Sequence, residues 1–213
     1  MILRTLFAAT ALLAACAPAP ANSSEAASQP RFNTPEGAEV AILASGCFWC
    51  TEADFEKLDG VLDAVSGFTG GDVEAPSYRQ VVRGGTGHVE AVRIEYDPGV
   101  ISYGDLLYHY WRTVDPLDGT GQFCDRGEAY MPRIFATTDE QAALARSSSE
   151  TVAARFDEPI AVRIEAAGAF WPAEDYHQDY AVKNPIRYQR YRFGCRRDQR
   201  LRELWGDEAG GLN

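Results

Sequence analysis

The chain has 213 residues, of which 46% are hydrophobic, so it can build one domain with a buried core. Its 31 acidic residues outnumber its 20 basic residues, and the formal net charge is −11. Such a charge repels phosphate groups and anionic lipid headgroups, which excludes nucleic acid as an expected partner.

The first residues have the pattern of an export signal. Arg4 provides a positive start, and the apolar run that reaches Ala15 is too short to span a bilayer. The run ends in Leu-Ala-Ala-Cys at 13–16, which resembles the lipobox of bacterial lipoproteins, where the signal is cleaved before a cysteine that is then acylated. We therefore predict a signal peptide at 1–15 and a lipid on Cys16, which would anchor an exported chain to a membrane on the periplasmic side of the bacterial cell envelope. The alternative is an ordinary cleaved signal followed by an incidental cysteine, and it exports the chain as well.

The rest of the chain divides into a spacer and one domain. Residues 16–35 are rich in Pro, Ala and Ser, a composition typical of a tether with little to bury. No repeat or second boundary follows, so we assign 36–213 to a single domain.

Hydrophobic periodicity predicts alternating strands and helices in this domain. Strands are expected at 40–44, 61–68, 89–96, 133–137 and 161–166. Helices are expected at 47–58, from an N-cap at Ser102 to about 114, from Thr138 to about 156, and at 174–183. The order is βαβ, then βαβ, then βα. It predicts an α/β fold, an α+β sandwich with a mixed sheet covered by helices, followed by a long irregular C-terminal segment.

Cys47 is the first candidate for chemistry. It follows Gly46 where the first strand gives way to a helix, so unpaired backbone N–H groups and the helix dipole would favour its thiolate. We interpret Cys47 as a nucleophile, and the alternative is a small buried hydrophobic residue. A zinc site would need a second close ligand pair beside Cys47 and Cys50, and the sequence offers none, so we predict no metal.

The segment Gly-Cys-Phe-Trp-Cys-Thr-Glu at 46–52 resembles the signature of type A peptide methionine sulfoxide reductases, the MsrA family. Further motifs resemble that family in the same order, at 67–71, 76–78, 85–91, 121–130 and 173–180. The resemblance implies an oxidoreductase that repairs oxidised proteins by reducing methionine S-sulfoxide, in peptides and as the free amino acid, to methionine. It implies no bound cofactor and an electron donor that is a thioredoxin-like dithiol.

The resemblance also implies roles for individual residues. Cys47 would attack the sulfoxide sulfur and become a sulfenic acid, and Glu90 would donate a proton, which requires burial to raise its pKa. The remaining matches are Phe48 and Trp49 as walls for the substrate methyl group, Tyr78 and Tyr130 as hydroxyls that hold the sulfoxide oxygen, and Asp125 as an acid that orders water or substrate. Core packing is the alternative for each aromatic residue.

The thiol that resolves the sulfenic acid is left open. Family members often place it in a Gly-rich tail, whereas this chain ends in an arginine-rich segment around Cys195 and has Cys50 where Gly is frequent. We favour Cys195, because nearby arginines should favour its thiolate and Gly194 should leave it mobile. Cys124 is less suited, because the neighbouring Asp125 would slow its attack.

Cys50 is the alternative resolving thiol. Side chains three residues apart on a helix have Cβ atoms ~5 to 6 Å apart, whereas a disulfide needs ~3.5 to 4.5 Å. A bridge to Cys47 therefore requires Cys47 to stand at the looser end of the helix. The same Cys-x-x-Cys permits a rival function, a thioredoxin-type disulfide oxidoreductase that uses Cys47 and Cys50. That class has no need of Glu90, Tyr78 and Tyr130.

The three histidines are expected outside the chemistry. His88 and His177 lie in family-like segments, where we expect structural hydrogen bonds. His109 lies between two tyrosines of a predicted helix, and we expect it at the surface.

Overall fold

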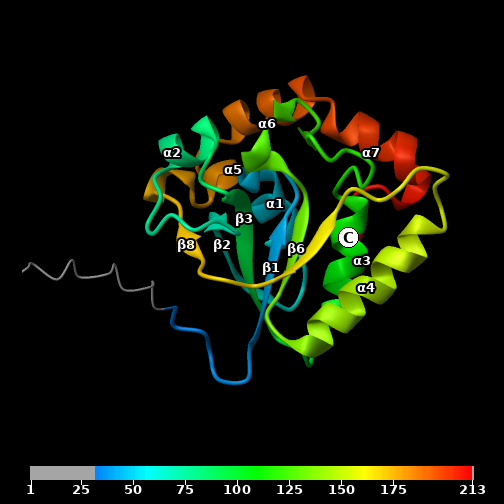
Figure 1. The fold of residues 1–213 in the computed structure, drawn as a ribbon, viewed down its shortest axis with the longest axis horizontal. Helices are drawn as coiled ribbons and strands as arrows, with labels where there is room; N and C mark the ends of the chain where they lie inside the picture. Colours follow the sequence, from blue (N-terminus) through cyan, green and yellow to red (C-terminus); the bar gives the residue numbers. More distant parts are fainter. Residues whose placement is uncertain (1–31, 213) are drawn as a thin grey trace, which may run out of the picture.

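The computed structural model describes residues 32–212 (Figure 1). The predicted signal peptide, Cys16 and most of the spacer lie outside this range, so these assignments stay predictions. Within 32–212, no helix is both long enough and apolar enough to cross a bilayer.

A six-stranded sheet lies at the centre, in the order β7-β6-β1-β3-β2-β8. The strands are β1 (Glu39–Ala44), β2 (Val61–Thr69), β3 (Val89–Tyr96), β6 (Arg133–Ala136), β7 (Arg163–Ala166) and β8 (Trp171–Pro172). Only β6 and β7 are parallel neighbours, so the predicted mixed sheet is confirmed. β3 lies between β1 and β2 and is antiparallel to both, so the first βαβ unit is split by a later strand.

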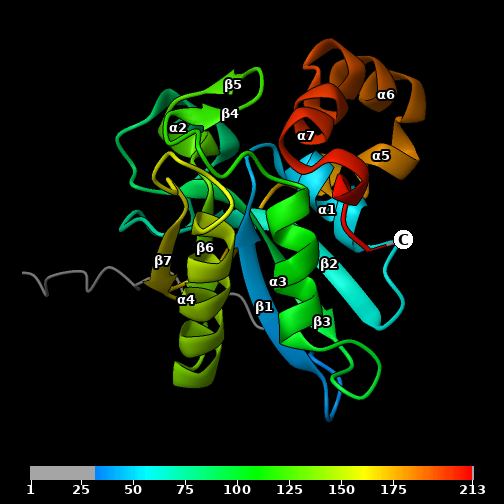
Figure 2. The same ribbon diagram turned by 90° about the vertical axis from the view of Figure 1, so that its right-hand side faces the viewer.

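Several helices pack on one face of the sheet. They include α1 (Phe48–Phe55), α3 (Tyr103–Arg112) and α4 (Asp139–Ala153), and α3 and α4 lie side by side in Figure 2. α3 begins where the sequence predicts, because the Ser102 hydroxyl accepts a hydrogen bond of 3.1 Å from the backbone N–H of Asp105. Leu43 and Ile94 of the sheet share one apolar core with these helices.

Irregular chain covers the opposite face. Because β7 and β8 lie at opposite edges of the sheet, the segment between them has to cross it, and Phe170 from this segment packs with Ile42 and Ala91. β3 is consequently buried on both faces. Two of its charged residues pair with each other, since Arg93 donates to Glu95 and lies 4.1 Å from the ring centre of Phe32.

The prediction of a long irregular C-terminal segment was wrong. The segment folds into α5 (Tyr180–Lys183), α6 (Pro185–Gly194) and α7 (Arg197–Trp205). In Figure 1, α6 and α7 arch over the end of the sheet where β1 leads into α1. α6 has no fully buried residue, so it carries almost no apolar periodicity to detect. Its start signal was nevertheless present, because Pro185 is the first helical residue.

Three smaller differences concern local backbone. The predicted helix at 174–183 is interrupted, because Asp179 adopts a left-handed φ of 52° between a 3₁₀ turn at Asp175–His177 and α5. The additional helix α2 (Tyr78–Arg83) opens with a capping box formed by Ser77 and Gln80. The short strands β4 (Gly121–Gln122) and β5 (Asp125–Arg126) form a separate hairpin.

The surface position expected for His109 was also wrong. His109 is fully buried, with its Nε2 2.8 Å from the carbonyl oxygen of Asp54 and its Nδ1 accepting from the N–H of Leu212 at 3.1 Å. Nε2 therefore carries the proton and donates. Burial lowers the pKa of His109 to about 4, so the ring is neutral near pH 7.

Candidate active site

Cys47 occupies the N-cap position of α1 at the end of a tight turn. Gly46 has a φ of +87°, and a Cβ at this position would lie 2.5 Å from the Cβ of Gln122, so only glycine fits. Cys47 itself has an extended ψ of 118°, and helical geometry begins after it. Cys47 thus stands at the loose end of the helix, while Cys50 lies within the first turn.

A small cavity of about 90 Å³ opens at Cys47. It is lined by every residue that the sequence assigns to the first chemical step, together with one that it does not: Cys47, Phe48, Trp49, Tyr78, Glu90, Asp125, Tyr130 and Tyr191. These residues come from α1, α2, β3, β5, α6 and the turn before β6. The split sheet brings them together, because β3 passes directly between β1 and β2.

Glu90 is the acid of this cavity. It is 1% exposed, and its Oε2 accepts a hydrogen bond of 2.9 Å from the backbone N–H of Phe48. Burial raises the pKa of Glu90 well above its ordinary value, and the nearby carboxylate of Asp125 raises it further. Glu90 therefore holds a proton that it can donate near neutral pH.

Two hydroxyls face the same space. Tyr78 and Tyr130 both line the cavity, and burial raises the pKa of Tyr78 to about 12. Both phenols keep their protons and can donate to an oxygen atom placed between them and Glu90.

Aromatic rings form the wall. Phe48 lies 4.9 Å from the ring centre of His177, and Trp49 stacks on Tyr180 at 3.7 Å. The indole N–H of Trp49 donates to Nδ1 of His177 at 3.0 Å, and burial lowers the pKa of His177 to about 4. His177 therefore supports the wall, and His88 likewise bonds to backbone, with its Nε2 2.8 Å from the carbonyl oxygen of Val73.

Cys47 and Cys50 are buried free thiols that interact with each other. Burial raises the pKa of Cys47 well above the usual thiol value, against the expectation from its helix position alone. The contact with Cys47 lowers the pKa of Cys50. Of the two thiols, Cys47 therefore holds its proton more tightly in the resting protein.

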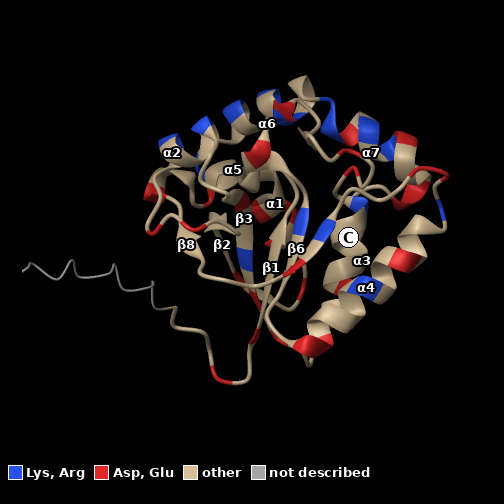
Figure 3. Cartoon of the chain, in the orientation of Figure 1, with Lys and Arg blue, Asp and Glu red and all other residues tan. Residues whose placement is uncertain are grey.

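Two arginines from the C-terminal helices lie next to this pair. Arg197 is 2% exposed and donates to the carbonyl oxygens of Ser45 and Thr113 at 3.2 and 2.6 Å. Arg192 binds both carboxylate oxygens of Asp54 at 2.9 and 3.1 Å. Their positive charges help to lower the pKa of Cys50. Figure 3 shows further positively charged positions along α6 and α7.

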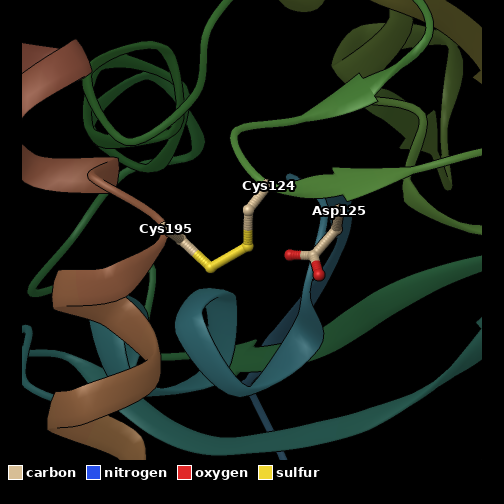
Figure 4. A group of neighbouring side chains, drawn as sticks. All are labelled: Cys124, Asp125 and Cys195. Atoms are coloured by element: carbon tan, nitrogen blue, oxygen red, sulfur yellow. A yellow bond between two sulfur atoms is a disulfide. The ribbon is translucent and has the colours of Figure 1, made fainter.

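The remaining described cysteines are bonded to each other. Cys195, directly after α6, forms a disulfide with Cys124 of the β4–β5 turn, and Asp125 lies beside it (Figure 4). Within 32–212, these three residues form the one group with metal-type ligand atoms close together, and the bridge occupies two of them. Cys195 can reach Cys47 only after this bridge is opened.

Comparison with known proteins decides the family. A model of the family described as "Peptide methionine sulfoxide reductase" matches residues 39–209. The chain belongs to this family. The enzyme named peptide methionine sulfoxide reductase MsrA 2 of Rhizobium meliloti (strain 1021) is 47% identical over 171 residues, which cover 80% of this chain and 85% of that protein.

Solved structures of the peptide methionine sulfoxide reductase family share the fold. The reduced form of Mxr1 from Saccharomyces cerevisiae superposes with a TM-score of 0.68 and 31% identity, over 71% of this chain and 88% of that chain. Mxr1 in complex with Trx2 superposes with a TM-score of 0.51 and 25% identity, over 69% of this chain and 87% of that chain.

Within this family fold, the sequence missed the contribution of the C-terminal helices. Tyr191, Arg192 and Arg197 all come from the segment expected to be irregular. The sequence gives one signal for them. The segment after Pro185 is rich in arginine and contains few acidic residues, whereas the chain as a whole is acidic.

Proposed function

We propose that this chain reduces methionine S-sulfoxide, in oxidised peptides and proteins and as the free amino acid, to methionine. The observation that carries the proposal is the cavity in which the Cys47 thiol meets a protonated buried acid, Glu90, and the hydroxyls of Tyr78 and Tyr130. An aromatic wall beside a proton donor fits a sulfoxide, which has an apolar methyl group and a polar oxygen on the same sulfur atom.

In the first step, the Cys47 sulfur attacks the sulfoxide sulfur and supplies two electrons. Glu90 protonates the sulfoxide oxygen, and the two tyrosine hydroxyls stabilise the charge that develops on it. The S–O bond of the substrate breaks, the oxygen and one proton remain on Cys47 as a sulfenic acid, and methionine leaves. The proton of the Cys47 thiol passes to the neighbouring Cys50 sulfur, because the interaction with Cys47 and the charges of Arg192 and Arg197 favour the ionised form of Cys50 before the attack.

In the second step, Cys50 resolves the sulfenic acid. The Cys50 sulfur attacks Cys47, the S–O bond breaks, and a disulfide and water form. This proposal replaces the preference for Cys195, because Cys47 stands at the N-cap where Cys50 already contacts it, while Cys195 is bonded to Cys124. The charges of Arg192 and Arg197 favour the attacking thiolate.

A thioredoxin-like dithiol protein then reduces the enzyme disulfide and is itself oxidised. The complex of the related Mxr1 with Trx2 supports this class of partner. A thioredoxin-type oxidoreductase activity of Cys47 and Cys50 is not favoured, because it leaves the protonated Glu90 and both tyrosines of the cavity without use.

The experiment is turnover of each epimer of a methionine sulfoxide peptide by the purified protein with a dithiol reductant. Reduction of the S epimer alone supports the proposal, and equal rates on both epimers refute it. Cys50→Ser and Cys195→Ser should both complete about one turnover. Loss of recycling in Cys50→Ser alone supports Cys50, and loss in Cys195→Ser alone returns the role to Cys195.

We also propose that the chain is exported and held to a membrane by a lipid on Cys16. The Leu-Ala-Ala-Cys sequence at 13–16 and the Pro-rich and Ala-rich spacer after it support this location. Cys16→Ser should release the protein into the soluble fraction with unchanged turnover. A variant that stays in the membrane fraction without detergent would contradict the anchor.

A further inference from the structure

Tyr191 is the one residue of the cavity wall that no sequence motif assigns. Its hydroxyl donates a hydrogen bond to Oδ2 of Asp125, and the residue lines the same cavity as the Cys47 thiol. Its ring meets the indole of Trp49 edge-on, with ring centres 5.8 Å apart. Tyr191 therefore faces the cavity of the attacking sulfur from α6, a helix that the family-like motifs do not include.

We propose that the Tyr191 hydroxyl is a catalytic hydrogen-bond donor that turns from Asp125 to the Cys47 sulfur as this sulfur ionises. A phenol has one proton and can serve one acceptor at a time. In the resting protein the Tyr191 hydroxyl donates to the carboxylate of Asp125. During the attack, the negative charge that develops on the Cys47 sulfur attracts the hydroxyl proton. The O–H bond rotates about the C–O bond of Tyr191, and no proton is transferred in this movement.

The surroundings of Cys47 show why such a donor matters. Burial raises the pKa of Cys47, and the interaction with Cys50 raises it further, whereas the interaction with Tyr191 lowers it. A hydrogen bond to a charged group is stronger than one between neutral groups, so the donor favours the ionised sulfur over the thiol.

Two anchors hold Tyr191 in this place. The next residue, Arg192, binds Asp54 of α1 through two hydrogen bonds, and Cys195, four residues on, is bonded to Cys124. Cys124 in turn directly precedes Asp125, the resting acceptor of the hydroxyl. The anchors fix α6 to both the nucleophile helix and the β4–β5 hairpin, so the hydroxyl is positioned before substrate arrives.

This role of Tyr191 rests on the proposed function, in which Cys47 is the nucleophile. The test therefore uses one readout that depends on sulfoxide reduction and one that does not. Tyr191→Phe removes the hydroxyl and keeps the ring against Trp49. The control is Tyr108→Phe on α3, whose exposed hydroxyl donates to Glu208 at 3.5 Å and does not line the cavity. The first readout is the single-turnover rate of methionine formation, which needs no resolving thiol. The second is the pH of half-maximal alkylation of Cys47 by iodoacetamide, followed by peptide mapping, which needs no sulfoxide.

We expect Tyr191→Phe to lower the single-turnover rate roughly 10- to 100-fold and to raise the half-alkylation pH of Cys47 by about one unit. Tyr108→Phe should change neither readout. An unchanged alkylation profile in Tyr191→Phe overturns the proposal even when the rate falls, because the hydroxyl would then only shape the cavity. If the chain lacks sulfoxide activity, the alkylation shift still decides the role of Tyr191.

A second variant keeps Tyr191 in place. Asp125→Asn weakens the competing acceptor and should lower the half-alkylation pH of Cys47, and it should do so by a smaller amount when Tyr191 is Phe. Equal shifts in the two backgrounds would mean that Asp125 acts on Cys47 through its charge alone, and they would overturn the proposed movement of the hydroxyl.

Discussion

The start of α1 and the α6–α7 segment both shape the surroundings of Cys47 and Cys50, but they do so by different physical means. The start of α1 uses a glycine turn, a helix terminus and apolar burial, with Gly46, Cys47 and Phe48 in consecutive positions. The α6–α7 segment uses charge, with Arg192 bound to Asp54 and Arg197 bound to backbone carbonyls. Residues that act through their local backbone are close in sequence, whereas residues that act through long side chains can come from anywhere in the chain.

The largest effect is expected at the α1 start. Cys47→Ser should abolish methionine formation while leaving the protein folded, because a hydroxyl is not appreciably ionised near neutral pH. The measurement is methionine released from a sulfoxide peptide, with circular dichroism as the check on folding. Normal turnover in this variant would mean that another thiol attacks.

Glu90→Gln tests the acid that faces this nucleophile. The amide keeps the shape and loses the proton that burial retains on the carboxyl group, so the rate should fall roughly 10²- to 10⁴-fold. Single-turnover rates measure this loss without interference from recycling. A change below about threefold would make Glu90 a structural residue.

Arg197→Met tests whether the α6–α7 segment depends on charge. The variant keeps most of the side-chain volume and removes the donors to Ser45 and Thr113, so we expect the free energy of unfolding to fall by about 3 kcal/mol. Arg202→Met, an exposed site on the same helix, is the control and should change it by less than about 0.5 kcal/mol. Urea unfolding measures both, and equal losses would show that helix packing rather than buried charge stabilises the segment.

The smallest effect concerns pH and returns to α1. Burial, with the nearby Glu56 charge, raises the pKa of Glu52 to about 7 in the folded protein, above the value of about 4.5 expected when unfolded. The folded state therefore binds more protons in this window, and the Glu52 contribution to stability is lost as pH rises from about 4.5 through 7.

Glu52→Gln removes this dependence. The free energy of unfolding of the variant minus that of wild type should therefore be about 2 kcal/mol larger at pH 8 than at pH 5. Urea titrations of both proteins at the two pH values measure the gain. A difference between the proteins that does not change with pH would show that Glu52 is ionised throughout.

Local signals explain what the sequence could predict. β1, β3 and α3 carry strong apolar patterns or a clear N-cap, and the strand at 89–96 lies where it was expected. The cavity residues were found because they belong to motifs that resemble a family. The sequence could not reveal that β3 inserts between β1 and β2, because strand order depends on long-range pairing that leaves no local pattern.

The failures have a common physical cause. His109 was expected at the surface because its neighbours are tyrosines, yet its two ring nitrogens meet backbone groups of Asp54 and Leu212, which lie far from it in sequence. α6 was missed because polar pairing replaces an apolar stripe. In each case a buried or ordered polar group is stabilised by a specific distant partner, and composition cannot identify that partner.

The two cysteine pairs also set how many electrons the protein can deliver without an external donor. The free pair Cys47 and Cys50 holds two electrons, while the Cys124–Cys195 bridge has already given up its two. Protein with this bridge closed should thus release about one methionine per chain when mixed with excess sulfoxide alone. A fully reduced protein would release about two if the pairs exchange disulfides and about one if they do not. The stoichiometry of this burst therefore reports whether the bridge belongs to the electron path or only fastens α6 to the hairpin.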